Sequence, residues 1–181
     1  MQLHYSLDPQ DFLQYHLFAA SHNKRLMAKR KKAWLVISAC LLFLALLSYS
    51  SNDNFLALLL LIYGIITLIF YPFFQRYHYK KSYEKYIKEH YKNRFGKLAS
   101  LEIKDDIIET TDSASETKMY LSEIDGITET GEYFFLIIKS GGHYIIPKRK
   151  ISKLAELKGF LQSLSQKLNI PYAHELNWKW K

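Results

Sequence analysis

The sequence contains a single cysteine, Cys40, among 181 residues. One thiol cannot form an intrachain disulfide, and it excludes a zinc site built from several cysteines. The motifs HExxH, CxxC and GxSxG, which mark common hydrolases and redox proteins, do not occur either. The seven histidines are scattered along the chain. We therefore expect a protein that is not an enzyme and that binds neither a metal ion nor a cofactor.

Charge is missing from two long stretches. Residues 33–52 and 54–75 are runs of 20 and 22 residues without Asp, Glu, Lys or Arg. About 20 mainly apolar residues in a helix cross the hydrocarbon core of a bilayer. The alternative is a pair of buried helices in a soluble fold, but a chain of this length offers little protein to cover both. We expect a transmembrane hairpin over 33–74, with helices at 33–50 and 55–74.

Basic residues flank both outer ends of this hairpin. Residues 24–32 carry six bases and no acid, and residues 75–97 carry eight bases and two acids. The SYSSNDN loop between the two helices has Asp53 as its only charge. Short segments rich in Lys and Arg stay in the cytoplasm, so we expect both termini there. The bases nearest the membrane, which anionic headgroups would attract, are Lys24, Arg25, Lys29, Arg30, Lys31, Lys32, Arg76, Lys80 and Lys81.

The rest of the chain is almost neutral. Residues 98–181 carry 11 bases and 12 acids, although the whole chain has a net charge of +8. The positive charge is therefore concentrated beside the predicted membrane, where topology explains it. We expect a lipid bilayer and a protein as partners, and no nucleic acid.

The segments on either side of the hairpin predict further helices. Residues 2–7 alternate apolar and polar side chains, which predicts a short strand. Asp8 and Pro9 then suit the N-cap and first turn of a helix, which could run through the bases of 24–32 into the first span. Residues 75–97 predict a helix with aromatic residues on one side and lysines on the other. That helix could lie on lipid, or it could pack on the soluble domain.

Residues 98–181 change to short β-branched and aromatic runs separated by polar breaks. The runs are 101–104, 107–111, 118–121, 126–130, 133–139 and 143–147, and the breaks are 105–106, 112–115, 131–132 and 140–142. This pattern predicts a six-stranded antiparallel meander. Ser152 can then cap an amphipathic helix that ends at Asn169. Six strands and one closing helix predict an α+β protein whose cytosolic part is a pleckstrin-homology-like (PH-like) barrel.

The stretch from Tyr133 to Arg149, YFFLIIKSGGHYIIPKR, joins an apolar strand, a glycine turn and a strand that ends in Ile-Pro-Lys-Arg. With two spans, a basic aromatic helix and one closing helix around it, the chain resembles the YcxB-like family of small bacterial membrane proteins. The resemblance extends over essentially the whole chain. It implies a PH-like domain after a two-span hairpin in the cytoplasmic (inner) membrane, and it implies no particular activity.

We accordingly divide the chain into four parts. These are an N-terminal strand and basic cytosolic helix (1–32), the transmembrane hairpin (33–74), a basic aromatic connecting helix (75–97) and the PH-like domain (98–181).

One group of bases in the last part suggests a binding site. Lys148, Arg149 and Lys150 are consecutive, and Lys153 follows closely. In PH-like domains, bases near strand ends often meet anionic headgroups, and such a cluster can hold phosphate. It could instead contact a protein partner, or it could be a solvated run of charge beside the membrane.

Three kinds of function fit these features. The first is a membrane-tethered interaction module that presents a strand edge or groove to a protein partner. The second is a ligand or lipid sensor that couples a cytosolic binding event to the hairpin. The third is an immunity protein that neutralises a membrane-acting toxin. The first requires least of the sequence, and it is the function we expect.

The predicted topology can be tested by cysteine labelling. In a Cys40→Ala background, single cysteines replace Ser51 in the loop and Ser113 in the C-terminal part. An impermeant thiol reagent applied to intact cells should label position 51 and leave position 113 unlabelled, because the basic ends stay inside. Labelling at 113 and not at 51 would contradict this topology.

Overall fold

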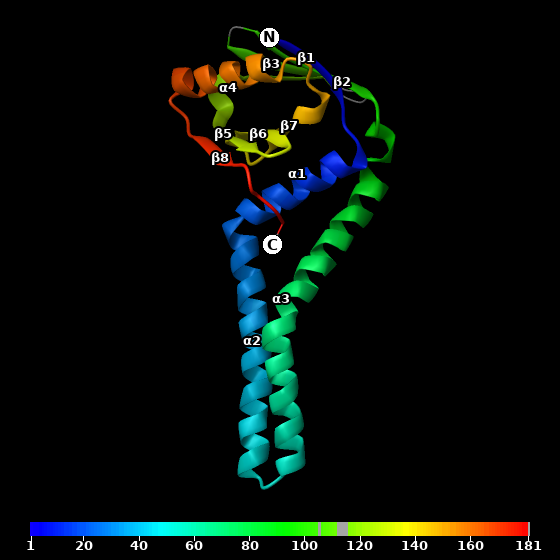
Figure 1. Ribbon diagram of the computed structural model, residues 1–181, viewed down its shortest axis with the longest axis vertical. Coiled ribbons are helices and arrows are strands. Elements are labelled where there is room, and N and C mark those ends of the chain that lie inside the picture. Colours follow the sequence, from blue (N-terminus) through cyan, green and yellow to red (C-terminus); the bar gives the residue numbers. More distant parts are fainter. Residues whose placement is uncertain (105, 112–115, 181) are drawn as a thin grey trace. The chain divides into compact units, whose positions relative to one another are not determined.

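The computed structural model describes residues 1–104, 106–111 and 116–180, and its helices and strands are shown in Figure 1. The chain forms two compact units. One joins Met1–His16 to Lys85–Lys179, and the other contains Leu17–Glu84 together with Trp180. The first unit thus includes the N-terminal segment, which our division of the sequence had kept apart from residues 98–181. The reason is strand pairing between the two segments.

The second unit is a helical hairpin. Helices α2 (Lys24–Ser50) and α3 (Asn54–His90) run side by side (Figure 1). Two hydrogen bonds connect them: the Trp34 indole N–H donates to the Leu68 carbonyl (3.1 Å), and the Gln75 amide donates to the Arg30 carbonyl (3.3 Å). The turn between the helices contains Asn52 in the left-handed region, at φ 58°.

Both helices are long and apolar enough to cross a membrane. Only 11% of the most apolar window of each helix is buried. A core helix of a soluble protein is mostly buried, and soluble proteins rarely expose large contiguous apolar surfaces. The hairpin therefore suggests association with a lipid bilayer.

Helix α1 (Pro9–His22) begins after Asp8, as the sequence predicted, but it does not continue into the first span. It ends at His22, and α2 begins at Lys24. The physical reason is Asn23, which has an extended backbone conformation and whose side chain accepts a hydrogen bond from the Leu26 N–H. Asn is a strong N-cap, so it starts a new helix at this point.

The strands form two four-stranded sheets. In the first, the order is β1-β2-β3-β4 and all pairs are antiparallel. Its strands are β1 (Gln2–Ser6), β2 (Leu98–Lys104), β3 (Ile107–Thr111) and β4 (Glu116–Tyr120). In the second, the order is β7-β6-β5-β8, and β8 is parallel to β5. Its strands are β5 (Ile124–Thr130), β6 (Tyr133–Ile138), β7 (His143–Pro147) and β8 (Tyr172–Glu175).

The six predicted strands are present, but they do not form one meander. A short 3-10 helix, η2 (Leu121–Glu123), carries the chain from the first sheet to the second, so β4 and β5 are not neighbours. In the described residues the strands form two sheets rather than a closed barrel. The predicted breaks at Asp105 and over 112–115 lie outside those residues.

Two further strands complete the sheets. β1 pairs with β2, with Leu3 opposite Leu101, so the predicted N-terminal strand joins the C-terminal fold. β8 was not predicted, because its sequence, YAHE, lacks the alternation of apolar and polar residues that marks a half-buried strand.

The core lies between the sheets and under helix α4 (Leu154–Leu168). Each sheet contributes apolar side chains, such as Ile108 and Phe134, and α4 contributes its leucine stripe. Asn169 ends α4 in the left-handed region, as predicted. The N-cap, however, is Lys153 and not Ser152, and no side chain caps this helix.

The predicted connecting helix over 75–97 is the second half of α3, which continues to His90 and is followed by a 3-10 helix, η1 (Lys92–Arg94). Gly96 then adopts a φ of 68°, and its N–H donates to the Leu7 carbonyl at 3.0 Å. Glycine suits this left-handed position because it has no Cβ. The turn therefore leads the chain into β2 beside the N-terminal segment.

Candidate functional site

Three of the four bases of the predicted cluster lie in a 3-10 helix, η3 (Lys148–Lys150), directly after β7, and Lys153 precedes α4. Its members do not form one exposed patch. The side chains of Lys148 and Lys150 are 13% and 19% exposed, whereas that of Lys153 is 75% exposed and reaches only Glu156, at 3.2 Å. Lys148 and Lys150 are therefore largely covered by the protein, whereas the Arg149 side chain remains 45% exposed.

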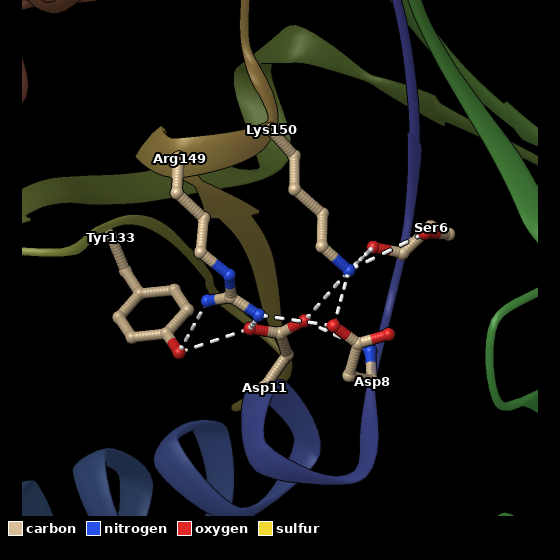
Figure 2. A network of polar contacts seen from close by, with 6 residues as sticks. All are labelled: Ser6, Asp8, Asp11, Tyr133, Arg149 and Lys150. Atoms are coloured by element: carbon tan, nitrogen blue, oxygen red, sulfur yellow. Dashed lines mark hydrogen bonds and ion pairs between the residues drawn. The ribbon is translucent and has the colours of Figure 1, made fainter.

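Figure 2 shows where Arg149 and Lys150 point. The Arg149 guanidinium lies 2.8 Å from the Asp11 carboxylate and 3.2 Å from that of Asp8. The Lys150 ammonium lies 2.7 Å from the Asp8 carboxylate and also donates to the Ser6 carbonyl at 2.7 Å. These contacts bind the segment between β1 and α1 to η3, across about 140 residues of sequence.

Asp11 is the centre of this network because its side chain is fully buried. It accepts hydrogen bonds from the Tyr133 hydroxyl (2.9 Å) and from the Asp8 N–H (2.9 Å), in addition to its ion pairs with Arg149 and Lys150. A buried carboxylate is costly unless it is paired and hydrogen-bonded. Here both carboxylate oxygens have partners, and the one bonded to the Asp8 N–H also helps to cap α1.

The charges of this network shift the acidity of their neighbours. A hydrogen bond from Lys150 lowers the pKa of Asp8. Burial raises the pKa of Tyr133 to about 12, although the hydrogen bond from Arg149 acts in the opposite direction. Tyr133 therefore stays protonated at neutral pH and donates to Asp11.

Lys148 belongs to a second cluster, centred on Glu129 of β5. The Glu129 side chain is only 4% exposed, and Lys148 and Lys158 approach it at 2.8 and 3.1 Å. The Tyr172 hydroxyl donates to it at 3.1 Å, and His174 lies at 3.3 Å. Burial opposes the charge on Glu129, but the hydrogen bonds from the two lysines outweigh it and lower the pKa to about 2. This cluster connects β5, η3, α4 and β8.

These geometries bear on the predicted headgroup site. Lys148, Arg149 and Lys150 each face a carboxylate of the same unit, so a phosphate would have to compete with Glu129, Asp8 or Asp11. A headgroup or partner contact at these bases stays a prediction. In this structure, Lys148, Arg149 and Lys150 form ion pairs that hold parts of the unit together.

The nine bases predicted beside the membrane lie in the first turns of α2 and in the middle of α3. Arg30 stacks over the rings of Tyr79 (5.2 Å) and Trp180 (4.8 Å), and the Trp180 indole donates to the Arg76 carbonyl at 3.1 Å. Lys80 is 3.9 Å from a Glu84 oxygen. The tail tryptophan therefore packs on the helical unit.

Sequence reasoning missed the acidic partners of the base cluster. Asp11 looked like an ordinary first-turn acid of a helix, and nothing local indicates that it is buried. The sequence did give a sign for Glu129, because this acid lies within the predicted strand 126–130, between Thr128 and Thr130. In the described residues, no group of three or more His, Cys, Asp or Glu side chains is placed to hold a metal ion.

The open edge of the first sheet is a candidate interaction surface. β4 is the last strand of this sheet and is largely exposed. The Leu121 N–H donates to the Asp106 carbonyl at 2.7 Å, so these two residues form a hydrogen-bonded pair next to β3 and β4. Hydrogen-bonded and non-bonded pairs alternate along an antiparallel ladder. Counting from this pair, the backbone groups of Met119 and Thr117 form hydrogen bonds to β3. The backbone N–H and C=O groups of Glu116, Lys118 and Tyr120 therefore point outward.

The Glu129 cluster makes the stability of this unit depend on pH. The pKa of Glu129 is about 2 in the folded protein and 4.5 in its unperturbed state. Its contribution is thus complete above pH 4.5 and is lost as the pH falls toward 2, by about 3 kcal/mol. Amide hydrogen exchange in β5 and β6 between pH 2 and 5 should show this loss.

Glu129→Gln isolates the effect, and Glu116→Gln on the exposed β4 strand is the control. Glu129→Gln should be less stable near neutral pH and should show a shallower acid dependence, whereas Glu116→Gln should behave as the unchanged protein. An equally steep loss in Glu129→Gln would show that other acids are responsible.

Comparison with known proteins identifies part of the chain. Residues 103–162 match the family model described as YcxB-like protein. No curated protein and no solved structure matches the chain. The matched residues extend from β2 to α4 and include η3 and Glu129. The resemblance seen in the sequence is confirmed for this region, and the chain carries a YcxB-like domain at residues 103–162.

Proposed function

We propose that this chain is a non-enzymatic protein of the bacterial cytoplasmic membrane that presents a PH-like domain to a protein partner. The α2–α3 hairpin crosses the bilayer twice, and both termini remain in the cytoplasm. The unit of Met1–His16 and Lys85–Lys179 recognises the partner. The observation that carries this proposal is the open, exposed edge of β4.

An open edge favours recognition by strand addition. A partner segment in extended conformation can bond to the outward N–H and C=O groups of Glu116, Lys118 and Tyr120, and main-chain bonds then provide affinity. The side chains of these three residues share one face of the sheet, where two opposite charges and an exposed aromatic ring can select the partner sequence. A lysine on an edge strand discourages pairing between copies of one protein, which favours a different protein as the partner.

Lipid sensing through the base cluster is less well supported. Anionic headgroups need accessible cations. Lys148, Arg149 and Lys150 are engaged by carboxylates of their own unit, although the Arg149 side chain is 45% exposed. Lys153 is the most exposed base of the cluster, at 75%. A single exposed lysine contributes about 1 kcal/mol near an anionic surface. Membrane attachment through the hairpin does not require it.

Photo-crosslinking at β4 tests the proposal. A photoreactive phenylalanine analogue at Tyr120 should crosslink one protein in growing cells, and the same analogue at Leu176 is the control. Both positions are exposed, but Leu176 lies just after β8 in the other sheet. The partner pairs with β4, so the crosslink should form at 120 and not at 176.

Two substitutions at Lys118 separate main-chain pairing from charge. Lys118→Pro removes an outward N–H and leaves the bonds to β3, whereas Lys118→Ala removes only the ammonium group. The crosslink at 120 should disappear with proline and persist with alanine. A crosslink that survives Lys118→Pro, or that forms equally at 176, would refute strand addition at this edge.

A further inference from the structure

A cavity of about 240 Å³ lies within the unit of Met1–His16 and Lys85–Lys179. Its walls come from five parts of the chain: the end of β1, helix α1, the segment after α3, the strands β2 and β3, and the edge strand β7. It is therefore a product of the same strand pairing that joins the N-terminal segment to the domain. The base cluster of η3 and the β4 edge do not line it.

Aromatic side chains form much of the wall. Phe12 and Tyr91 pack with their ring centroids 4.6 Å apart, and Tyr15 lies edge-on to His143 at 5.8 Å. Rings arranged in this way offer both faces and edges to an incoming ring. A cavity of about 150 Å³ accepts benzene, whereas drug-sized ligands occupy about 300–1,000 Å³. The volume here suits one aromatic ring with a short substituent.

The polar part of the wall is cationic. Arg94 and Lys97 both line the cavity, and none of the described lining residues is acidic. Lys97 forms no ion pair with the described residues, unlike the cations of η3. An arginine and a lysine at one cavity favour an anionic group, which a guanidinium can bind through two parallel hydrogen bonds.

Tyr5 provides an independent indication. It lines the cavity and is only 7% exposed. Burial raises the pKa of Tyr5, so the hydroxyl stays protonated and can donate. A hydroxyl at the wall of the cavity can therefore donate a hydrogen bond to a polar atom of a bound molecule.

We propose that this cavity binds a small carboxylate with a single aromatic ring. The ring packs among Phe12, Tyr15 and Tyr91, the carboxylate pairs with Lys97 and Arg94, and the Tyr5 hydroxyl donates to a polar atom of the ligand. This site is independent of strand addition at β4, and either proposal can fail without the other.

Fluorine NMR of 4-fluorophenylacetate tests the site, with the full-length protein in nanodiscs of zwitterionic lipid and empty nanodiscs as the blank. The acid should bind saturably. The neutral 4-fluorophenylacetamide should bind at least about tenfold more weakly, because it lacks the charge that meets Lys97 and Arg94. Equal affinity for the acid and the amide would overturn the proposal.

Variants locate the binding. Ala99→Leu, which fills the cavity from β2, should abolish binding, and Lys97→Gln should weaken it about tenfold. Lys92→Gln, an exposed lysine of η1 outside the lining, should leave it unchanged. Tyr5→Phe removes the hydroxyl that donates to the ligand, so it should weaken binding while the amide exchange of β1 stays protected. Unchanged affinity in both Tyr5→Phe and Lys97→Gln would place the ligand elsewhere and overturn the assignment.

Discussion

A carboxylate without contact with water organises the larger unit of this protein. Asp11 is fully buried, and an isolated charge in that position would cost several kcal/mol. The cost is offset because Arg149, Lys150 and Tyr133 converge on it from the other end of the chain. These contacts hold the start of α1 against η3 and β6. Because β1 directly precedes α1, they also hold β1 beside β2.

This constraint explains why the N-terminus and the C-terminal strands form one unit although the hairpin separates them in sequence. With β1 paired to β2, the two edge strands of the first sheet are β1 and β4, and the space between β1, α1 and β7 becomes the aromatic cavity. In the second sheet, Glu129 is likewise a buried carboxylate with several partners, and its contacts join β8 and α4 to β5. The bases of η3 thus form ion pairs that hold parts of this unit together.

Local patterns in the sequence predicted much of this architecture. The two long apolar helices, six of the strands and the end of α4 at Asn169 depend on runs of neighbouring residues, and they were found. The pairing of β1 with β2 could not be read from local patterns, because those strands are about 95 residues apart. β8 was missed because it is held by Tyr172 and its neighbours against β5 and has no pattern of its own. Lys148, Arg149 and Lys150 were recognised as a cluster, but their direction depends on Asp8, Asp11 and Glu129, and only tertiary structure brings these acids to them.

The Asp11–Arg149 contact couples the N-terminal segment to the domain. A double-mutant cycle with Asp11→Asn and Arg149→Gln measures this coupling, with the amide exchange of Leu3 and Tyr5 in β1 as the readout. We expect an interaction energy of about 2 kcal/mol, and we expect each single variant to expose β1 while β6 stays protected. A coupling below about 0.5 kcal/mol, with β1 as protected as in the unchanged protein, would contradict the account.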